Sequence, residues 1–348
     1  MLSIKTLKHT PSNIVLWDSL AELNSNFFQS TVFDKMQVVY NQIPVYFELW
    51  NGEMLISGVK MYYWESRKFG FVTSIFSKYF HQYSEIIYYS NLKEDVLFFE
   101  CKKKLQEAVD NYILMNKIVS VQVTGVYGNT EMLLSFKSKA EEVFNYNSGY
   151  VNLCDVNCID FFNNFNRNTK RNLKKAEENQ LVFSELNDND IFHETLDKIF
   201  SQQKPINHPP HKKFTDIFFK MLTGKAHLAT HQVKFKNEIL AVSLFVISNK
   251  NAYSLFGGSV KNEIGAGHFL YYELMKIFQK NNICKFYFGQ VSQDKNELNK
   301  KFSVGISGFK RGFGLTEIPT YKKLFIIRPF KNRIWIILLR IQKLIQNV

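Results

Sequence analysis

The same succession of predicted elements occurs twice along the chain, and this repetition constrains the fold more than any other feature. In the first half, VYFELW and EMLISGVKMYYW flank Asn51-Gly52, an Asn-Gly tip between apolar runs that predicts a β-hairpin. In the second half, AHLATHQVKF and EILAVSLFVIS flank Lys236-Asn237, and in both halves a Glu follows the tip (GEMLIS and NEILAV). We interpret the pattern as a divergent duplication of one structural unit.

A further strand, a helix and another strand follow each hairpin in the same order. We predict a helix over 97–115 followed by the strand KIVSVQVTG in the first half, and a helix over 268–280 followed by the strand ICKFYFGQ in the second. Another helix, over 135–144, is expected to close the first half. This alternation favours an α/β (α+β) fold class, in which each half has a mixed, mainly antiparallel sheet flanked by helices.

A chain of 348 residues is long enough for two domains. The join is expected over 145–160, a stretch rich in Asn that holds no long Pro or Gly linker. We therefore divide the chain into an N-terminal domain, 1–150, a C-terminal domain that carries the working site, 151–328, and a C-terminal amphipathic basic helix, 329–348.

The charge balance narrows the classes of partner. Lys and Arg number 44 against 31 acidic residues, a net charge of +13. Such a surface attracts nucleic acid, phospholipid headgroups or nucleotide-bearing substrates. A basic surface that only aids solubility is the alternative.

The four cysteines, Cys101, Cys154, Cys158 and Cys284, form no CxxC pair and no dense disulfide pattern. We expect reduced thiols in a cytoplasmic protein. The first residues hold no apolar signal segment, and no run of about twenty apolar residues occurs, so we expect neither secretion nor a membrane span.

Five cations recur at helical spacing in FNRNTKRNLKKAEENQLVF. They would form one stripe of a helix, and they are Arg167, Lys170, Arg171, Lys174 and Lys175. Like charges at these spacings repel one another, so a stripe that tolerates the repulsion is a candidate anion-binding surface. A solvated helix face is the alternative.

A short glycine-containing segment, Asn262 to His268, lies between the strand NAYSLFGGSV and the helix GHFLYYELMKIF. Glycine at such a junction lets the backbone approach a phosphate, with N–H groups and the helix dipole directed at the anion. We therefore expect a phosphate-bearing ligand to bind at Asn262, Gly265, Ala266, Gly267 and His268. A plain turn is the alternative.

The segment 308–314, GFKRGFG, places Lys310 and Arg311 among glycines and between Phe309 and Phe313. Such a sequence can hold a positive charge at a rigid turn. A surface turn without function is the alternative.

Together, RNTKRNLKKA, the GAG loop, KFYFGQ and FKRGFG resemble FemAB-like and BioF2-like acyltransferases of the GNAT superfamily, and the resemblance covers nearly the whole chain. It implies two tandem GNAT-like domains, the first degenerate, and transfer of an acyl or aminoacyl group from an activated donor to an amine. It also implies that Lys310 stabilises charge on the reacting carbonyl, beside Phe309.

The superfamily's coenzyme A loop has the pattern Q/R-x-x-G-x-G/A. This chain has Asn262 where Gln or Arg is usual, with Gly265 and Gly267 in register. The substitution weakens the assignment of coenzyme A, although main-chain N–H groups supply most of such a cradle. The resemblance further implies that the strand ILAVSLFV lies beside the donor and offers backbone groups around Ser243 to Phe245.

No covalent nucleophile can be recognised from spacing, and direct attack by an amine needs none. The amine must still lose a proton, for which Glu263 and Tyr287 are candidates by location. His208-Pro-Pro-His211 cannot form a helical HxxH face because of its prolines, so we assign a loop and no metal there.

The tail FKNRIWIILLRIQKLIQNV has an apolar helical stripe bordered by Lys and Arg. Such a helix packs onto its own domain or lies on an anionic membrane surface, which would suit a membrane-bound acceptor.

We therefore expect a cytoplasmic N-acyltransferase or aminoacyltransferase with no permanently bound cofactor. Its co-substrate would be acyl-coenzyme A, an acyl carrier thioester or an aminoacyl-tRNA. Its amine acceptor would be a cell-wall or cell-envelope precursor, and the cations Arg167, Lys170, Arg171, Lys174 and Arg311 would bind anionic groups. The alternatives are a non-catalytic GNAT-like module that binds a nucleotide-bearing ligand, and a nucleic-acid-binding protein, which the missing base-reading residues disfavour.

Overall fold

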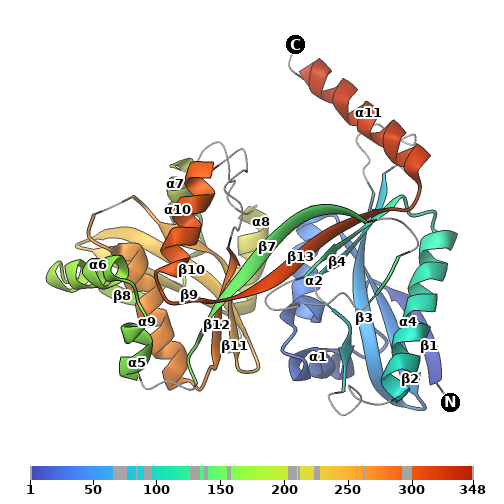
Figure 1. Ribbon diagram of the computed structural model, residues 1–348, viewed down its shortest axis with the longest axis horizontal. Coiled ribbons are helices and arrows are strands. Elements are labelled where there is room, and N and C mark those ends of the chain that lie inside the picture. Colours follow the sequence, from blue (N-terminus) through green and yellow to red (C-terminus); the bar gives the residue numbers. More distant parts are fainter. Residues whose placement is uncertain are drawn as a thin grey trace. The chain divides into compact units, whose positions relative to one another are not determined.

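The chain divides into two compact units in the computed structural model (Figure 1): Met1–Asn145 with Thr320–Val348, and Tyr146–Pro319. The structure describes residues 2–346 except 66–76, 84, 90–95, 126–133, 137–139, 155–157, 203–209, 211, 223–227, 262 and 292–299. Residues 320–328, which the division by sequence assigns to the second domain, lie in the first unit. Each unit is a mixed, mainly antiparallel sheet with helices, which confirms the predicted fold class.

The first unit has the sheet order β1-β2-β3-β4-β6-β13, with β5 paired to β3. Its strands are β1 Leu2–Lys8, β2 Ile43–Asn51, β3 Met54–Glu65, β4 Lys78–Tyr83, β5 Ile87–Tyr88, β6 Ser120–Thr124 and the part of β13 (Thr316–Ile326) that begins at Thr320. Its α-helices are α1 Ile14–Leu23, α2 Thr31–Gln37, α4 Val96–Met115 and α11 Pro329–Gln346. All these strand pairs are antiparallel except β4–β6.

The first sheet is covered on both faces, because alternate side chains of a strand point to opposite sides. On β2, Phe47 packs in the cluster that contains Val109 of α4. Its neighbour Tyr46 instead meets Trp17 of α1, with ring centroids 4.8 Å apart. The predicted turn at Asn51-Gly52 is present, and Gly52 has φ +60 there. The apolar alternation of the hairpin thus positions α4 on one face and α1 on the other.

A buried ion pair fastens α2 to this sheet. The Lys60 ammonium of β3 lies 2.6 Å from the Asp34 carboxylate of α2, and the Lys60 side chain is fully buried. Asp34 also accepts hydrogen bonds from the hydroxyls of Tyr46 and Tyr62. Burial raises the pKa of Asp34 and lowers that of Lys60, and each partner opposes the other's shift. Such a pair is costly to break, because one charge would remain buried alone.

The second unit has the sheet order β7-β12-β11-β10-β9-β8. Its strands are β7 Ala140–Asn152 from Tyr146 onward, β8 Val182–Glu185, β9 Leu228–Phe235, β10 Glu238–Ser248, β11 Asn251–Ser259 and β12 Lys285–Val291. Its helices are α5 Cys158–Asn163, α6 Arg167–Glu178, α7 Asn189–Ser201, α8 Lys212–Leu222, α9 Ala266–Lys280 and α10 Lys300–Arg311. Strands β11 and β12 are parallel, and the other pairs that involve β8 to β12 are antiparallel.

Most of the predicted elements are confirmed, including both hairpins and the helices that follow them, α4 and α9. The expected helix over 135–144 is wrong, because β7 begins at Ala140. This strand pairs with β12 from Asn147↔Val291 to Asn152↔Lys285. Its Phe and Tyr residues favour the pleated surface of a sheet, and the partner strand lies more than a hundred residues away in sequence. Tertiary pairing therefore overrides the local helical pattern.

The expectation of reduced thiols is also wrong for two cysteines. Cys154 and Cys284 form a disulfide with Cα atoms 4.5 Å apart and a sequence separation of 130. They meet because β7 and β12 are paired beside them, and the Leu153 amide donates to the Cys284 carbonyl at 2.7 Å. Cys101 is a buried free thiol in α4. No described helix has the length and apolar character needed to cross a membrane.

We predict that the disulfide stabilises the second unit. The double variant Cys154→Ser/Cys284→Ser should lower the free energy of unfolding by about 2–4 kcal/mol under non-reducing conditions, because the unfolded chain regains loop entropy. Urea titrations followed by circular dichroism, with and without dithiothreitol, measure this. Cys101→Ser is the control and should keep the wild-type sensitivity to reductant. Equal stability of the double variant and wild type without reductant would contradict the prediction.

Candidate active site

The parallel pair β11–β12 is hydrogen-bonded at one end only. Its register runs from Asn251↔Lys285 to Tyr253↔Tyr287, although β11 continues to Ser259 and β12 to Val291. Beyond this point β12 remains paired with β7, with a register shift between Tyr287 and Gly289, and Gly289 has φ +79. A bulge of this kind bends a strand away from its neighbour. We call the diverging segments 254–259 and 288–291 the splay.

The matching strand pair of the first unit does not diverge in this way. There β4 and β6 are also parallel, and they pair from Tyr79↔Ser120 through Tyr83↔Thr124, the full length of β6. Backbone groups on facing edges of β4 and β6 are therefore used within the sheet. In the second unit, by contrast, residues 254–259 of β11 and 288–291 of β12 are not paired with one another.

The glycine loop lies where β11 leads into α9. Gly265 is the N-cap of α9 and adopts a left-handed conformation, φ +80. A Cβ atom on Gly265 would stand 2.1 Å from the Asn172 carbonyl oxygen of α6, so only glycine fits here. The first N–H groups of a helix have no intrahelical acceptor, and the helix dipole makes this end favourable to anions. Ala266 and Gly267 are buried in the first turn, and Asn262 lies outside the described residues.

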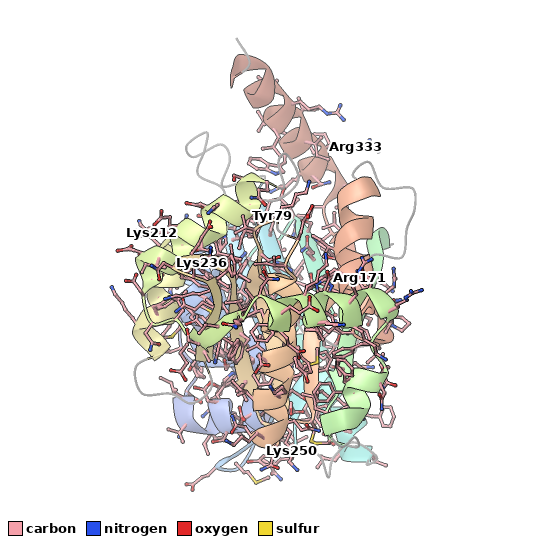
Figure 2. The ribbon with its side chains drawn as sticks, turned by 90° about the vertical axis from the view of Figure 1, so that its left-hand side faces the viewer. Tyr79, Arg171, Lys212, Lys236, Lys250 and Arg333 are labelled. Carbon is pink, nitrogen blue, oxygen red and sulfur yellow. A yellow bond between two sulfur atoms is a disulfide. The ribbon has the colours of Figure 1, made fainter. Side chains whose placement is uncertain are left out.

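The predicted basic helix is α6, and its five cations differ in their contacts. The Lys175 ammonium donates to the Glu263 carbonyl at 3.2 Å, so this cation lies on the glycine loop. By contrast, Lys170 donates to the Asn163 carbonyl, and Arg171 to the Asn168 side chain. Lys174 and Arg167 are exposed, and Lys174 lies 3.9 Å from Glu178. In Figure 2, Arg171 extends outward from α6. The stripe is thus a solvated face with Lys175 at the loop.

Lys310 reaches the splay from the last turn of α10. Its ammonium donates to the Gln290 carbonyl of β12 at 2.7 Å, beyond the last residue of β12 that pairs with β11. The residue is partly buried, and burial lowers the pKa of its ammonium to about 8. The turn expected over 308–314 is wrong for its first residues, because α10 continues through Arg311. The chain turns only at Gly312 to Gly314.

Phe309 holds the end of α10 against α9. Its ring contacts His268 at a centroid distance of 4.8 Å and Tyr271 at 5.6 Å. Aromatic packing of this kind fixes the helix end on which Lys310 is carried. Phe309 is therefore a positioning residue. His268, the third residue of α9, is partly buried, and burial lowers its pKa to about 4, so its imidazole is neutral at pH 7.

Arg311 is engaged elsewhere. Its guanidinium lies 2.6 Å from the Glu317 carboxylate, and this carboxylate also accepts a hydrogen bond from Asn147 at 2.7 Å. Arg311 lowers the pKa of Glu317, so the two residues are an ion pair at neutral pH. The expected role of Arg311 in binding an anion would require a break in this pair.

The two expected proton acceptors differ in environment. Glu263 is exposed, and its backbone carbonyl rather than its carboxylate contacts Lys175. Tyr287 is buried at the last position of β12 that pairs with β11, stacked on Tyr253 at 5.1 Å and near Tyr150 at 5.3 Å. Burial raises its pKa to about 12, so at neutral pH it is a hydroxyl and no base. The Tyr150 and Tyr253 rings were missed because their spacing in sequence says nothing about the strands they share.

Ser243 and Phe245, expected to lie beside the donor, are on β10, an internal strand. Ser243 pairs with His231 of β9 and with Gly257 of β11, so backbone groups on both edges of β10 are used within the sheet. Phe245 packs into the core against Phe278 of α9, with ring centroids 4.7 Å apart. The expectation is wrong for these two residues, because the strand edge at the splay belongs to β11, one strand further along the sheet.

Gln290 was also missed, because its carbonyl rather than its side chain bonds Lys310. The Gly-Gln step at the end of KFYFGQ, where a strand loses its regular pattern, is the signal that could have indicated it. His208 and His211 lie outside the described residues. In the described part of the chain, no group of three or more His, Cys, Asp and Glu residues is arranged to hold a metal ion.

We predict that the loop conformation depends on Gly265. Gly265→Ala should lower the free energy of unfolding by about 1–3 kcal/mol, because of its positive φ and its contact with the Asn172 carbonyl. Gly305→Ala is the matched control: it lies in α10 with nothing within 4 Å of the added methyl, and should stabilise by about 0.5–1 kcal/mol. Urea unfolding of both variants measures this. A Gly265→Ala protein as stable as wild type would disprove the assigned conformation.

No protein-family model matches the chain, and no curated protein sequence matches it. Several solved structures align with the chain. FemX aligns with a TM-score of 0.69 at 11% identity, over 94% of this chain and 99% of its own. A tandem GNAT protein from the clavulanic acid biosynthesis pathway aligns with 0.51 at 7% identity, over 93% and 98%. L-PGS from Bacillus licheniformis aligns with 0.50 at 11% identity, over 78% and 81%. The chain therefore has the fold of FemX and of tandem GNAT proteins, which confirms the fold implied by the FemAB-like resemblance.

Proposed function

We propose that the chain is an acyltransferase that moves an acyl or aminoacyl group from an activated donor to an amine, at the splay of the second unit. The observation that carries the proposal is the Lys310 ammonium, held by the Gln290 carbonyl where β11 and β12 have diverged. The glycine loop at the N-terminus of α9 and Lys175 on that loop support a phosphate-bearing donor.

The reaction follows from these groups. The donor carbonyl enters between the strand edges, and the amine attacks its carbon to form a tetrahedral intermediate with a negative oxygen. A preorganised cation stabilises this oxygen in a site with little water, which is the role proposed for Lys310. The bond to the leaving thiolate or ribose oxygen then breaks. The proton lost by the amine passes to the leaving group by way of water.

Two classes of donor suit the site. An acyl thioester of coenzyme A would place its pyrophosphate on the glycine loop, at the N-terminus of α9. An aminoacyl-tRNA would use the exposed cations of α6 and the net charge of +13. For the acceptor, we propose the amine of a cell-envelope precursor, in keeping with the FemAB-like resemblance. These donors occur in the cytoplasm, and the proposal therefore includes a cytoplasmic location, where the Cys154–Cys284 disulfide would be exposed to reduction.

We predict that Lys310→Ala lowers kcat about 100- to 1000-fold, the usual effect of removing one oxyanion donor. Transfer of radiolabelled acyl groups from acetyl-coenzyme A and from aminoacyl-tRNA to a panel of amines measures this. Lys280→Ala, an exposed lysine at the end of α9, is the control and should leave kcat unchanged.

The pH profile separates a charged from a structural role of Lys310. Its ammonium loses a proton near pH 8, so activity that depends on the charge should fall above that pH. In Lys310→Arg the charge persists, and the fall near pH 8 should disappear. A fully active Lys310→Ala protein would overturn the proposal. Binding of a donor by wild type without transfer to any amine would favour the non-catalytic module.

We predict that salt dependence identifies the donor. Binding of tRNA through four or five phosphates would give a slope of log K against log salt of about −3 to −4, whereas acetyl-coenzyme A would give a shallow slope. Fluorescence anisotropy over a salt series measures both. Arg167→Ala/Arg171→Ala/Lys174→Ala should flatten the tRNA slope by about 2, with Lys280→Ala as control. A flat tRNA slope in wild type would exclude the tRNA donor.

A further inference from the structure

The first unit holds a cavity of about 430 Å³ beneath α11. Its walls come mainly from rings on one face of the sheet, Tyr62, Trp64 and Tyr79, and from Trp335 and Leu339 of α11. Tyr79 and Trp335 approach within 6.4 Å, centroid to centroid, so the first half of α11 contacts β4. This volume and apolar lining are typical of a site for a small apolar ligand or a lipid chain.

The floor of the cavity is polar but neutral. His81 contacts the Gln122 amide at 2.9 Å and the Thr124 hydroxyl at 3.0 Å, and the Gln122 amide donates to the Thr124 hydroxyl at 3.5 Å. Burial, with a smaller effect of Lys322, lowers the pKa of His81 to about 3, so its ring carries no charge at neutral pH. The buried Oε1 atom of Gln42, on the cavity wall, has no hydrogen-bond partner among the described residues. The floor therefore favours an uncharged ligand group.

The opposite face of α11 is apolar and uncovered. Phe330, Ile337 and Ile341, at intervals of seven and four residues, are 76%, 54% and 46% exposed. Arg333 and Arg340 are exposed beside this stripe, and Figure 2 shows Arg333 extending away from the helix. An exposed apolar stripe flanked by arginines is the pattern of a helix that lies in a membrane interface.

Cations gather where α11 begins. Burial lowers the pKa of the Lys331 ammonium, and the positive charges of Arg328, Lys117 and Lys78 lower it further. Like charges repel one another, so a group of cations favours an anion at its surface. Lipid phosphates meet this requirement, and Trp and Tyr side chains, here Trp335 and Tyr79, are enriched at the headgroup level of membranes.

We propose that α11 lies on the surface of an anionic bilayer and that the cavity beneath it takes an apolar chain of a lipid from that bilayer. Charge complementarity selects this occupant: a second copy of the chain would bring like charges onto Arg333, Arg340 and the Lys331 cluster. The proposal is independent of the transfer reaction.

The test uses the full chain and vesicles of phosphatidylglycerol and phosphatidylcholine, with pure phosphatidylcholine as reference. We expect co-sedimentation with the anionic vesicles that weakens with salt. Arg333→Glu/Arg340→Glu should reduce partitioning at least tenfold, since each basic residue near an anionic surface contributes about 1 kcal/mol. Ile337→Ser should also reduce it. Lys103→Glu on α4 and Val15→Ser on α1, an exposed cation and an exposed apolar residue elsewhere in the unit, should not.

Tryptophan fluorescence tests the cavity itself. With phosphatidylglycerol brominated in its acyl chains, Trp64 in a Trp335→Phe protein should be quenched, because Trp64 lines the cavity. Removing Trp64 as well leaves Trp17 and Trp50, which are buried near α1 and should not be quenched. Circular dichroism establishes that each variant is folded.

Two results would overturn the proposal. Wild type that does not bind anionic vesicles refutes the membrane surface, and dimerisation that Ile337→Ser abolishes would then assign the stripe to a second copy. Vesicle binding without quenching of Trp64 refutes the lipid chain in the cavity.

Discussion

The candidate site depends on one constraint, the divergence of two parallel strands that are hydrogen-bonded at one end. Strand edges in a sheet interior are normally used by neighbours, which leaves nothing for a ligand. Here β11 remains paired with β10, and β12 remains paired with β7. The facing edges of β11 and β12 separate after Tyr253 and Tyr287. The bulge before Gly289 bends β12 locally, while its pairing with β7 continues to Val291.

The remaining parts of the site are arranged around this opening. Helix α9 begins at the end of β11, which brings the positive end of its dipole to the splay. Helix α10 ends at β12, where Phe309 packs on α9 and Lys310 bonds the strand. Partial burial weakens the hold of Lys310 on its proton, and the same loss of water strengthens its attraction for a developing negative charge.

The two units share one order of elements but differ in how their matching parallel strands pair. In the first unit the matching strands pair over the whole of β6, and the Asp34–Lys60 ion pair fastens α2 over the neighbouring strands. The part of the sheet face left beyond α2 is lined by aromatic rings and covered by α11. Because β4 and β6 pair over the whole of β6, they do not diverge as β11 and β12 do. The part of the sheet face that α2 leaves uncovered instead forms a wall of the cavity under α11.

Local patterns in the sequence determined the hairpins, the helices α4, α6, α9 and α11, and the glycine loop, because turn residues and helical periodicity act within a few residues. The fixed cation was also predictable, since FKRGFG combines charge with anchoring rings. Its partner was not, because the Gln290 carbonyl carries no side-chain signal.

Tertiary structure alone decided the rest. The β7 strand, the Cys154–Cys284 disulfide and the internal position of β10 all follow from pairings between distant segments. The same is true of the ion pair that occupies Arg311 and of the contact that brings Lys175, but not Arg171, to the loop. A sequence states which groups are available; only the pairing of strands and the packing of helices decide which of them meet, since those contacts join residues that no local pattern connects.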